Sequence, residues 1–338
     1  MSKTTKLDSA MIKRGLLLLS LLFFSASSFS GDFQGVGVAE PGAELWHQLR
    51  DRTPTDQALA EQLKSKMAIT NTAAINDAGQ LWRQFRIEEI LPAGGRALLG
   101  ILLALAAFRI VRGRIKLKGG RSGKTVKRFS NWQRFVHWWV AITFVTLGIT
   151  GVAIMFGRVV LMPWLGADIG GTVMYASRRA HDFVGPVFGV GMVLMIVTFM
   201  KGNFPSLKTD LIWLLKGGGL FGGHAPAGRY NAGEKVWYWL ASIFGLVVIA
   251  TGLILDFPIF EQTRNQMMLS LTVHGLLALV LVGVSMGHIY IGTVGMEGAF
   301  EAMATGLCDT QWAKEHHDLW YEELVAKGEI EPIEQQKT

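Results

Sequence analysis

The apolar positions of this chain are gathered into five long runs and do not alternate with polar positions. A helix needs about 20 apolar residues, rising 1.5 Å each, to cross the hydrocarbon core of a membrane. A membrane barrel would instead show alternation along short strands. We therefore predict an all-α membrane protein whose five transmembrane helices lie at residues 91–111, 135–156, 183–200, 236–255 and 269–294.

The first run differs from the other four because it contains arginines. Arg96 and Arg109 leave only residues 97–108 uncharged, although long side chains near helix ends can extend to the interfaces. The other runs contain no Asp, Glu, Lys or Arg. The pattern therefore predicts a four-helix transmembrane bundle over residues 135–294, preceded by one additional N-terminal transmembrane helix at 91–111.

The N-terminus has the order of a secretory signal peptide. Four basic residues precede an apolar stretch at 15–24, and small residues follow at 25–30. We interpret residues 1–30 as a signal peptide, with an uncleaved anchor helix as the alternative. Either interpretation places the polar extension at 31–90 in the periplasm.

The loops between the helices differ strongly in their basic residues. Segment 109–134 holds ten Lys and Arg and no acidic residue, and segment 201–235 holds five more, whereas the two opposite loops hold four together. Basic loops favour the cytoplasmic side of a membrane. We therefore expect the loop at 112–134 and the C-terminal tail at 295–338 to lie in the cytoplasm, with the chain in the bacterial inner membrane. A basic run held between two membrane helices is not expected to bind nucleic acid.

Composition narrows the class of protein further. Hydrophobic residues make up 50% of the chain and charged residues only 17%, against about 25% charged in soluble proteins. The single cysteine, Cys308, excludes a disulfide framework, an iron–sulfur protein and covalent haem attachment through a CxxCH motif.

Four of the eight histidines fall in or beside the predicted membrane helices, where ionisable residues are expensive and usually functional. With the orientation above, His137 and His288 lie near the cytoplasmic face, and His181 and His274 lie near the periplasmic face. His274 and His288 are fourteen residues apart on one helix. That spacing is about 21 Å along the axis and roughly 40° short of four full turns, so both face nearly the same side. The expected pairs are His181 with His274, and His137 with His288.

Two imidazoles at each of two depths fit haem, whose iron takes two axial nitrogens while the macrocycle fills apolar space between helices. Zinc would need three or four ligands gathered together, and a proton relay would need carboxylates that the spans lack. We therefore predict two non-covalent b haems. In the alternative, each histidine hydrogen-bonds between helices and the chain is a haem-free membrane anchor or transporter. His316 and His317 are interpreted as a solvated pair.

Several sequence elements, taken together, resemble the gamma subunit of formate dehydrogenase, a membrane dihaem cytochrome b556 subunit. The elements are Phe-Ser-Asn-Trp-Gln-Arg-Phe-Val-His-Trp-Trp at 129–139, Arg-Arg-Ala-His-Asp at 178–182, Tyr-Asn-Ala-Gly-Glu-Lys at 230–235, and the spacing of His274 and His288. The resemblance covers roughly residues 125–325. The N-terminal extension and the additional first helix are similar to the longer form of that family.

The resemblance implies an electron-transfer role within an enzyme complex of anaerobic respiration, not a separate enzyme. A molybdenum or tungsten catalytic subunit would oxidise formate outside the membrane, and an iron–sulfur subunit would pass the electrons on. His181 and His274 would hold the periplasmic-side haem of a dihaem cytochrome b bundle. His137 and His288 would hold the cytoplasmic-side haem, from which menaquinone or ubiquinone takes the electrons.

The same resemblance implies a quinone pocket at the cytoplasmic face. Asn231 and Gly233 would form it beside His288, and Glu234 and Lys235 would be proton-uptake residues. In the alternative interpretation, Asn231 is simply the N-cap of a helix.

The same arrangement of two haems would also serve a respiratory complex with a different electron donor. The cytochrome b subunit of a nickel–iron hydrogenase or of a thiosulfate reductase is the nearest alternative, because the substrate is never bound by this chain. The motif at 231–235 favours formate.

A loose repeat links two of the predicted helices. Thr150-Gly151 and Thr251-Gly252 follow an aromatic segment in each case. The second helix lacks a histidine, so the pattern is only a faint sign of duplication.

Overall fold

The computed structural model describes residues 82–219, 225–259 and 261–333. The expected signal peptide and most of the extension at 31–90 lie outside the described residues. Within them, five helices are long and apolar enough to cross a membrane. The prediction of five membrane helices is therefore confirmed.

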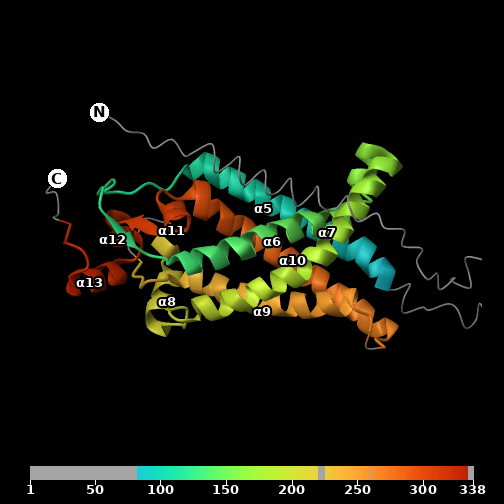
Figure 1. The fold of residues 1–338 in the computed structure, drawn as a ribbon. Helices are drawn as coiled ribbons and strands as arrows, with labels where there is room; N and C mark the ends of the chain where they lie inside the picture. The colour runs from blue at the N-terminus through green and yellow to red at the C-terminus, as the bar shows by residue number, and fades with distance from the viewer. Residues whose placement is uncertain (1–81, 220–224, 260, 334–338) are drawn as a thin grey trace, which may run out of the picture. The chain divides into compact units, whose positions relative to one another are not determined.

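The five helices lie side by side along one common direction (Figure 1). They are α5 (Leu91–Arg112), α6 (Asn131–Phe156), α7 (Leu161–Met200), α9 (Ala232–Asp256) and α10 (Arg264–Tyr290). The π-helical η2 (Phe85–Ile90) leads into α5, and the π-helical η4 (Ile291–Gly295) continues α10.

Helix α7 begins well before the apolar run that predicted it. The run starts at residue 183, whereas the helix starts at Leu161 and is kinked at Gly166, where φ is 75°. Hydropathy marks the part of a helix that suits lipid, and the charged residues between 168 and 182 lie outside that part while still continuing the helix.

Two antiparallel helix pairs build the bundle. Helix α6 packs along α7, α10 packs along α9, and α7 contacts α9 (Figure 1). The additional helix α5 packs mainly against α10. This arrangement is the expected four-helix bundle with one further helix on its outside.

Glycines allow α5 and α10 to approach closely. A Cβ placed on Gly94 would lie 2.7 Å from a methyl carbon of Leu279, and one on Gly283 would lie 2.8 Å from a methyl carbon of Ile101. Both distances are well inside the roughly 3.5–4.0 Å optimum for two carbon atoms. Small residues therefore hold this interface together by permitting contact between the helices, as in other membrane bundles.

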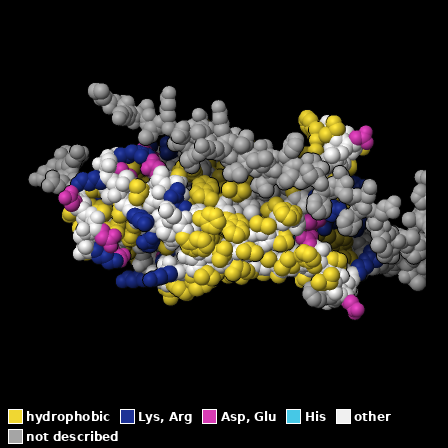
Figure 2. Space-filling model, in the orientation of Figure 1, with side chains coloured by type: hydrophobic (Ala, Val, Ile, Leu, Met, Phe, Trp, Pro, Cys, Tyr) yellow, Lys and Arg dark blue, Asp and Glu magenta, His cyan; other side chains and the backbone are white. Residues whose placement is uncertain are grey.

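The outer surface of the bundle is apolar. Exposed fractions reach 87% at Val111, 69% at Val197 and 66% at Ile149. Figure 2 shows hydrophobic side chains over most of the visible face of the bundle, with most of the Lys and Arg at one end and a few charged side chains at the other. An apolar band bordered by charge is what lipid requires of a membrane protein surface.

Three of the long helices begin with the same capping motif. Ser130, Asn231 and Thr263 are the N-caps of α6, α9 and α10, and each side chain accepts a hydrogen bond from a backbone N–H three residues later. Gln or Glu at that third position accepts a hydrogen bond from the backbone N–H of the N-cap in return. Capping boxes of this kind fix where each helix starts.

The basic loop and the C-terminal tail fold together, although the sequence suggested two separate segments. Strand β1 (Thr125–Lys127) pairs antiparallel with β2 (Leu307–Asp309), and Val126 lies opposite Cys308. We call residues 113–130 and 296–333 the cap. The cap contains α11 (Ala299–Thr305), α12 (Thr310–His316) and α13 (Asp318–Ala326), whereas α8 (Leu207–Leu215) and η3 (Gly217–Gly219) lie between α7 and α9 in the chain.

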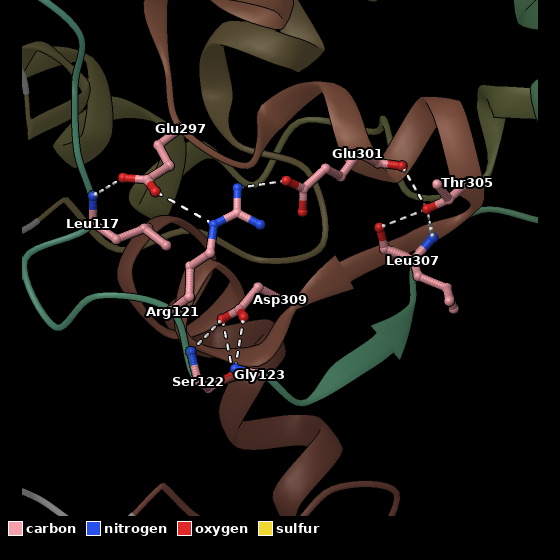
Figure 3. A network of polar contacts seen from close by, with 9 residues as sticks. All are labelled: Leu117, Arg121, Ser122, Gly123, Glu297, Glu301, Thr305, Leu307 and Asp309. Atoms are coloured by element: carbon pink, nitrogen blue, oxygen red, sulfur yellow. Dashed lines mark hydrogen bonds and ion pairs between the residues drawn. The ribbon is translucent and has the colours of Figure 1, made fainter. Parts of the chain in front are cut away.

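Acidic residues of the tail neutralise part of the basic loop. Arg121 forms ion pairs with Glu297 and Glu301, and Asp309 accepts hydrogen bonds from the backbone N–H groups of Ser122 and Gly123 (Figure 3). These contacts join segments that lie more than 170 residues apart in the chain. The basic loop and the acidic tail therefore hold each other in place through these contacts.

The interpretation of His316 and His317 as a solvated pair is wrong, because His317 is fully buried in the cap and Nε2 of His316 is buried too. Nδ1 of His317 lies 2.8 Å from the carbonyl oxygen of Gly228, and its Nε2 lies 3.1 Å from Nη2 of Arg128. Burial and the Arg128 guanidinium lower the pKa of His317 to about 3. The packing that buries this imidazole comes from both chain segments, so its neighbours in the sequence give no sign of it.

Acid is expected to open the cap. The imidazole is neutral in the folded cap but has a pKa of about 6.5 when unfolded, so its contribution to stability is full above pH 6.5 and declines as the pH falls towards 3. Cys308, the single cysteine, is fully buried beside these residues. Its labelling by a maleimide, normalised to the denatured chain at each pH, should become roughly 20-fold faster between pH 7 and pH 5. His317→Asn should weaken this dependence, and His316, whose pKa is also lowered by burial, should account for part of what remains. Equal protection of the wild-type thiol at both pH values would contradict the assignment.

Candidate haem-binding site

The structure brings together two histidines at the end of the bundle away from the basic loops. His181 on α7 and His274 on α10 have ring centroids 6.1 Å apart. His137 on α6 and His288 on α10 form a second pair, with centroids 6.3 Å apart. These are the pairs expected from the spacing, and we refer to them as the outer pair and the inner pair.

The two pairs lie at different depths in the bundle. His137 is seven residues from the N-cap of α6, whereas Thr150, which contacts His181, is 20 residues from it. At 1.5 Å per residue the difference is about 20 Å along the helix. The inner pair is therefore near the basic end, and the outer pair is near the opposite end.

The outer imidazoles are held through Nδ1. His181 Nδ1 lies 2.9 Å from Oγ1 of Thr150, and His274 Nδ1 lies 3.0 Å from the carbonyl oxygen of Val248 and 3.3 Å from Oγ1 of Thr251. A metal-binding imidazole usually donates its second nitrogen to such an acceptor. The outer pair therefore has the arrangement expected of ligands.

The inner imidazoles are held differently. The ring of His288 stacks on Trp237, with centroids 5.3 Å apart and an angle of 24° between the planes. Nδ1 of His137 is buried and has no hydrogen-bond partner among the described residues. A buried nitrogen without a partner is costly, so this ring is not fixed by a hydrogen bond at Nδ1 as the outer rings are.

Both pairs fit a metal ion held between two rings. Imidazole–metal bonds are roughly 2 Å long, so two rings on opposite sides of one ion have centroids roughly 6 Å apart, close to the 6.1 and 6.3 Å observed. Among the described residues, no three His, Cys, Asp or Glu side chains are grouped as ligands of a metal ion. Each pair therefore offers two nitrogens, which suits an ion whose other ligands come from a macrocycle.

The first turns of α9 lie beside the inner pair. Asn231 is the N-cap, and its Oδ1 accepts a hydrogen bond from the backbone N–H of Glu234. Trp237, one turn after Gly233, carries the ring that stacks on His288. The N-cap interpretation of Asn231 is therefore confirmed, and its amide nitrogen is not used by the cap.

Gly233 is needed for close packing. A Cβ at this position would lie 2.9 Å from the Trp213 ring of α8. The sequence gives no sign of this contact because Trp213 belongs to a short helix in the preceding loop.

Glu234 and Lys235 both form ion pairs. Nη2 of Arg128 lies 3.0 Å from Glu234 Oε1, and Nζ of Lys235 lies 2.9 Å from Asp210 Oδ1. Arg128 is only 3% exposed. Through these ion pairs, Glu234 and Lys235 both anchor neighbouring segments of the chain to α9.

Charged side chains lie near His181 of the outer pair. Arg178 forms an ion pair with Asp182 at 2.7 Å and lies 3.6 Å from Asp256 of α9. Nε of Arg179 lies 3.2 Å from the hydroxyl oxygen of Tyr175. The ion pairs of Arg178 link α7 to α9 next to the outer pair.

The chain is similar to known proteins. It is 30% identical over 207 residues to the formate dehydrogenase, nitrate-inducible, cytochrome b556(Fdn) subunit of Escherichia coli K12, which covers 60% of this chain and 92% of that protein. It is 29% identical over 204 residues to the formate dehydrogenase cytochrome b556(fdo) subunit of the same organism, covering 59% and 93%. The formate dehydrogenase cytochrome b556 subunit of Haemophilus influenzae is 29% identical over 214 residues, covering 60% and 85%.

A family model also matches this chain, over the bundle. Residues 128–306 match the model described as prokaryotic cytochrome b561. The matched segment contains α6, α7, α9 and α10 with all four paired histidines, and it excludes the additional helix α5. With its five apolar helices, the chain is a multi-pass membrane protein that belongs to the prokaryotic cytochrome b561 family.

Proposed function

We propose that this chain is the membrane-anchoring cytochrome b subunit of a respiratory formate dehydrogenase and carries electrons to the quinone pool. The observation that carries the proposal is the presence of two histidine pairs at two depths, each spaced for one ion. The similar proteins named formate dehydrogenase cytochrome b556 subunits support the identity of the complex.

The outer and inner pairs would each hold one b haem. The haems supply one-electron transfer, while the chain supplies their ligands, spacing and apolar surroundings. His181 and His274 are the proposed ligands on the periplasmic side, and His137 and His288 are those on the cytoplasmic side. The basic loops at the inner end support this orientation and a place in the bacterial inner membrane.

Quinone would bind where α9 begins. Asn231 can donate a hydrogen bond from its amide nitrogen to a quinone carbonyl, Gly233 lets the first turn of α9 pack closely against Trp213, and His288 lies next to Trp237. Protons taken up with the electrons would pass by Glu234 and Lys235, which lie at the same end of α9. The quinone is menaquinone or ubiquinone.

The partners are a molybdenum- or tungsten-containing catalytic subunit and an iron–sulfur subunit. This chain contains a single cysteine and therefore cannot ligate the iron–sulfur clusters that connect formate oxidation to the outer haem. The electron source must accordingly lie in another chain.

Purification of the tagged chain from native membranes tests the proposal. The expected result is two b haems per chain, with a reduced-minus-oxidised spectrum of b type, and co-purification of a formate-oxidising subunit with an iron–sulfur subunit. Formate should reduce both haems. Absence of haem would eliminate the cytochrome function, and co-purification with a hydrogenase or thiosulfate reductase in place of formate dehydrogenase would overturn only the assigned electron source.

A further inference from the structure

The outer histidines are held by two copies of one structural device. Thr150 and Gly151 of α6 contact His181, which lies on the next helix, α7. Thr251 and Gly252 of α9 contact His274, which lies on the next helix, α10. Each helix pair thus contributes one histidine and the residues that hold it.

The two copies match in detail. Each threonine stands 20 residues after the N-cap of its helix, Ser130 in α6 and Asn231 in α9. Both helices begin with a capping box. The equal spacing puts the two threonines at the same depth, about 30 Å from the helix start.

Each threonine hydroxyl already donates its proton to a backbone carbonyl of its own helix. Thr150 Oγ1 lies 2.8 Å from the carbonyl oxygen of Thr146, and Thr251 Oγ1 lies 2.7 Å from that of Val247. A hydroxyl has one proton, so each oxygen can only accept from the histidine beside it. The neighbouring carbonyls of Leu147 and Val248, each three residues before its threonine, are further acceptors for the two imidazoles.

These acceptors decide the tautomer of both rings. An imidazole facing only acceptors through Nδ1 must carry its proton there, which leaves the lone pair on Nε2. Neutral imidazole with a free Nε2 is the form that binds a metal ion. The hydrogen bond from Nδ1 also makes the ligand more basic and fixes the orientation of the ring.

The glycines provide the room for the rings. A Cβ on Gly151 would lie 3.2 Å from Cε1 of His181, and a Cβ on Gly252 would lie 3.2 Å from Cε1 of His274. Each imidazole therefore lies directly on the backbone of the neighbouring helix.

The inner pair lacks this device. His137 Nδ1 has no partner among the described residues. The residue of α9 that matches His137 in distance from the N-cap is Tyr238, whose hydroxyl donates to the carbonyl oxygen of Ile196 at 2.7 Å. The repeat therefore serves only the outer pair.

We propose that Thr150-Gly151 and Thr251-Gly252 are paired positioning residues for the outer haem, which fix the Nδ1–H tautomer of His181 and His274 and lower the midpoint potential of that haem. This inference rests on the proposed dihaem function. It assigns to the Thr-Gly repeat a role in tuning a potential, because a more basic ligand favours the oxidised iron.

Redox potentiometry of the purified complex tests the role of the threonines. Thr150→Val should raise the midpoint potential of the outer haem by about 59 mV, which corresponds to a tenfold change for a one-electron couple. Thr251→Val should give a smaller rise, because His274 has the closer partner in Val248. The inner haem should not change, and Thr150→Ser should restore the wild-type value.

A matched control lies on the same helix. Thr143 makes the same backbone hydrogen bonds as Thr150, to the carbonyl oxygens of Trp139 and Val140, so Thr143→Val should leave both potentials unchanged. For the glycines, Gly151→Val should reduce occupancy of the outer haem. Gly148→Ala should not, because its Cβ would make only an ordinary 3.7 Å contact with Val282.

The outcomes separate the two proposals. Both haems bound with unchanged potentials in Thr150→Val and Thr251→Val would overturn the inference and leave the dihaem function intact. An equal shift in Thr143→Val would overturn it as well, since the effect would then be general. A wild-type chain without haem would instead overturn the proposed function.

Discussion

A complex carrying His288→Gln is expected to bind one haem per chain where the wild type binds two. His288 is paired with His137 across the inner site, so removing one axial ligand releases the inner haem. Quinone reduction should fall at least 100-fold, whereas formate should still reduce the remaining outer haem. Haem content and formate-reduced spectra measure both effects.

The control for this variant is His316→Gln, which changes a histidine of the cap outside both pairs and should retain two haems. Retention of both haems in His288→Gln would contradict the pairing. Loss of both haems, with the chain still folded in the membrane, would also contradict it, since the outer pair shares no residue with the inner pair.

The opposite variant should give the opposite defect. In His181→Gln the outer haem is lost, because His274 alone remains at that site. Formate should then fail to reduce the inner haem on the time scale of turnover, although dithionite should reduce it fully. The chemical reductant separates an interrupted electron path from a missing cofactor.

The readout of this second variant is the rate of haem reduction after mixing with formate. A fall of at least 100-fold is expected, because the electron would have to cross about 20 Å more without the outer haem. Reduction of the remaining haem at the wild-type rate would show that electrons do not pass through the outer site.

The membrane helices and the histidine pairs could be predicted because both depend on position along one axis. Apolar runs mark the spans, and the fourteen residues between His274 and His288 fix two depths on one helix. Loop charge then gives the direction of each helix, which is enough to say that His181 lies near His274. The structure has the same two groupings.

The cap could not be predicted, because its contacts join distant segments. Strands β1 and β2 have three residues each and lie about 180 residues apart. Their pairing buries His317 against Arg128, so a pair of neighbouring histidines that resembles a solvated surface contains one buried residue. Local sequence carries no information about such a contact.

The Thr-Gly repeat could be seen in the sequence, at Thr150-Gly151 and Thr251-Gly252, but its role could not be predicted from it. Each copy acts on a histidine of the following helix, 31 and 23 residues later. The lack of a histidine in the second helix of the repeat therefore said nothing against its function.

The ion-pair partner of Lys235 could not be predicted from the sequence either. A lysine beside a quinone motif suggested proton uptake, and the structure places its ammonium group against Asp210. Asp210 belongs to α8, in the loop between the two helix pairs, and nothing in the motif itself points to it.

An experimental density map of the purified complex tests the central claim most directly. The account predicts two porphyrins at two depths, one with its iron bonded to Nε2 of His181 and His274, the other to Nε2 of His137 and His288. Density for a single porphyrin, or for histidines of different depths bound to the same iron, would contradict it.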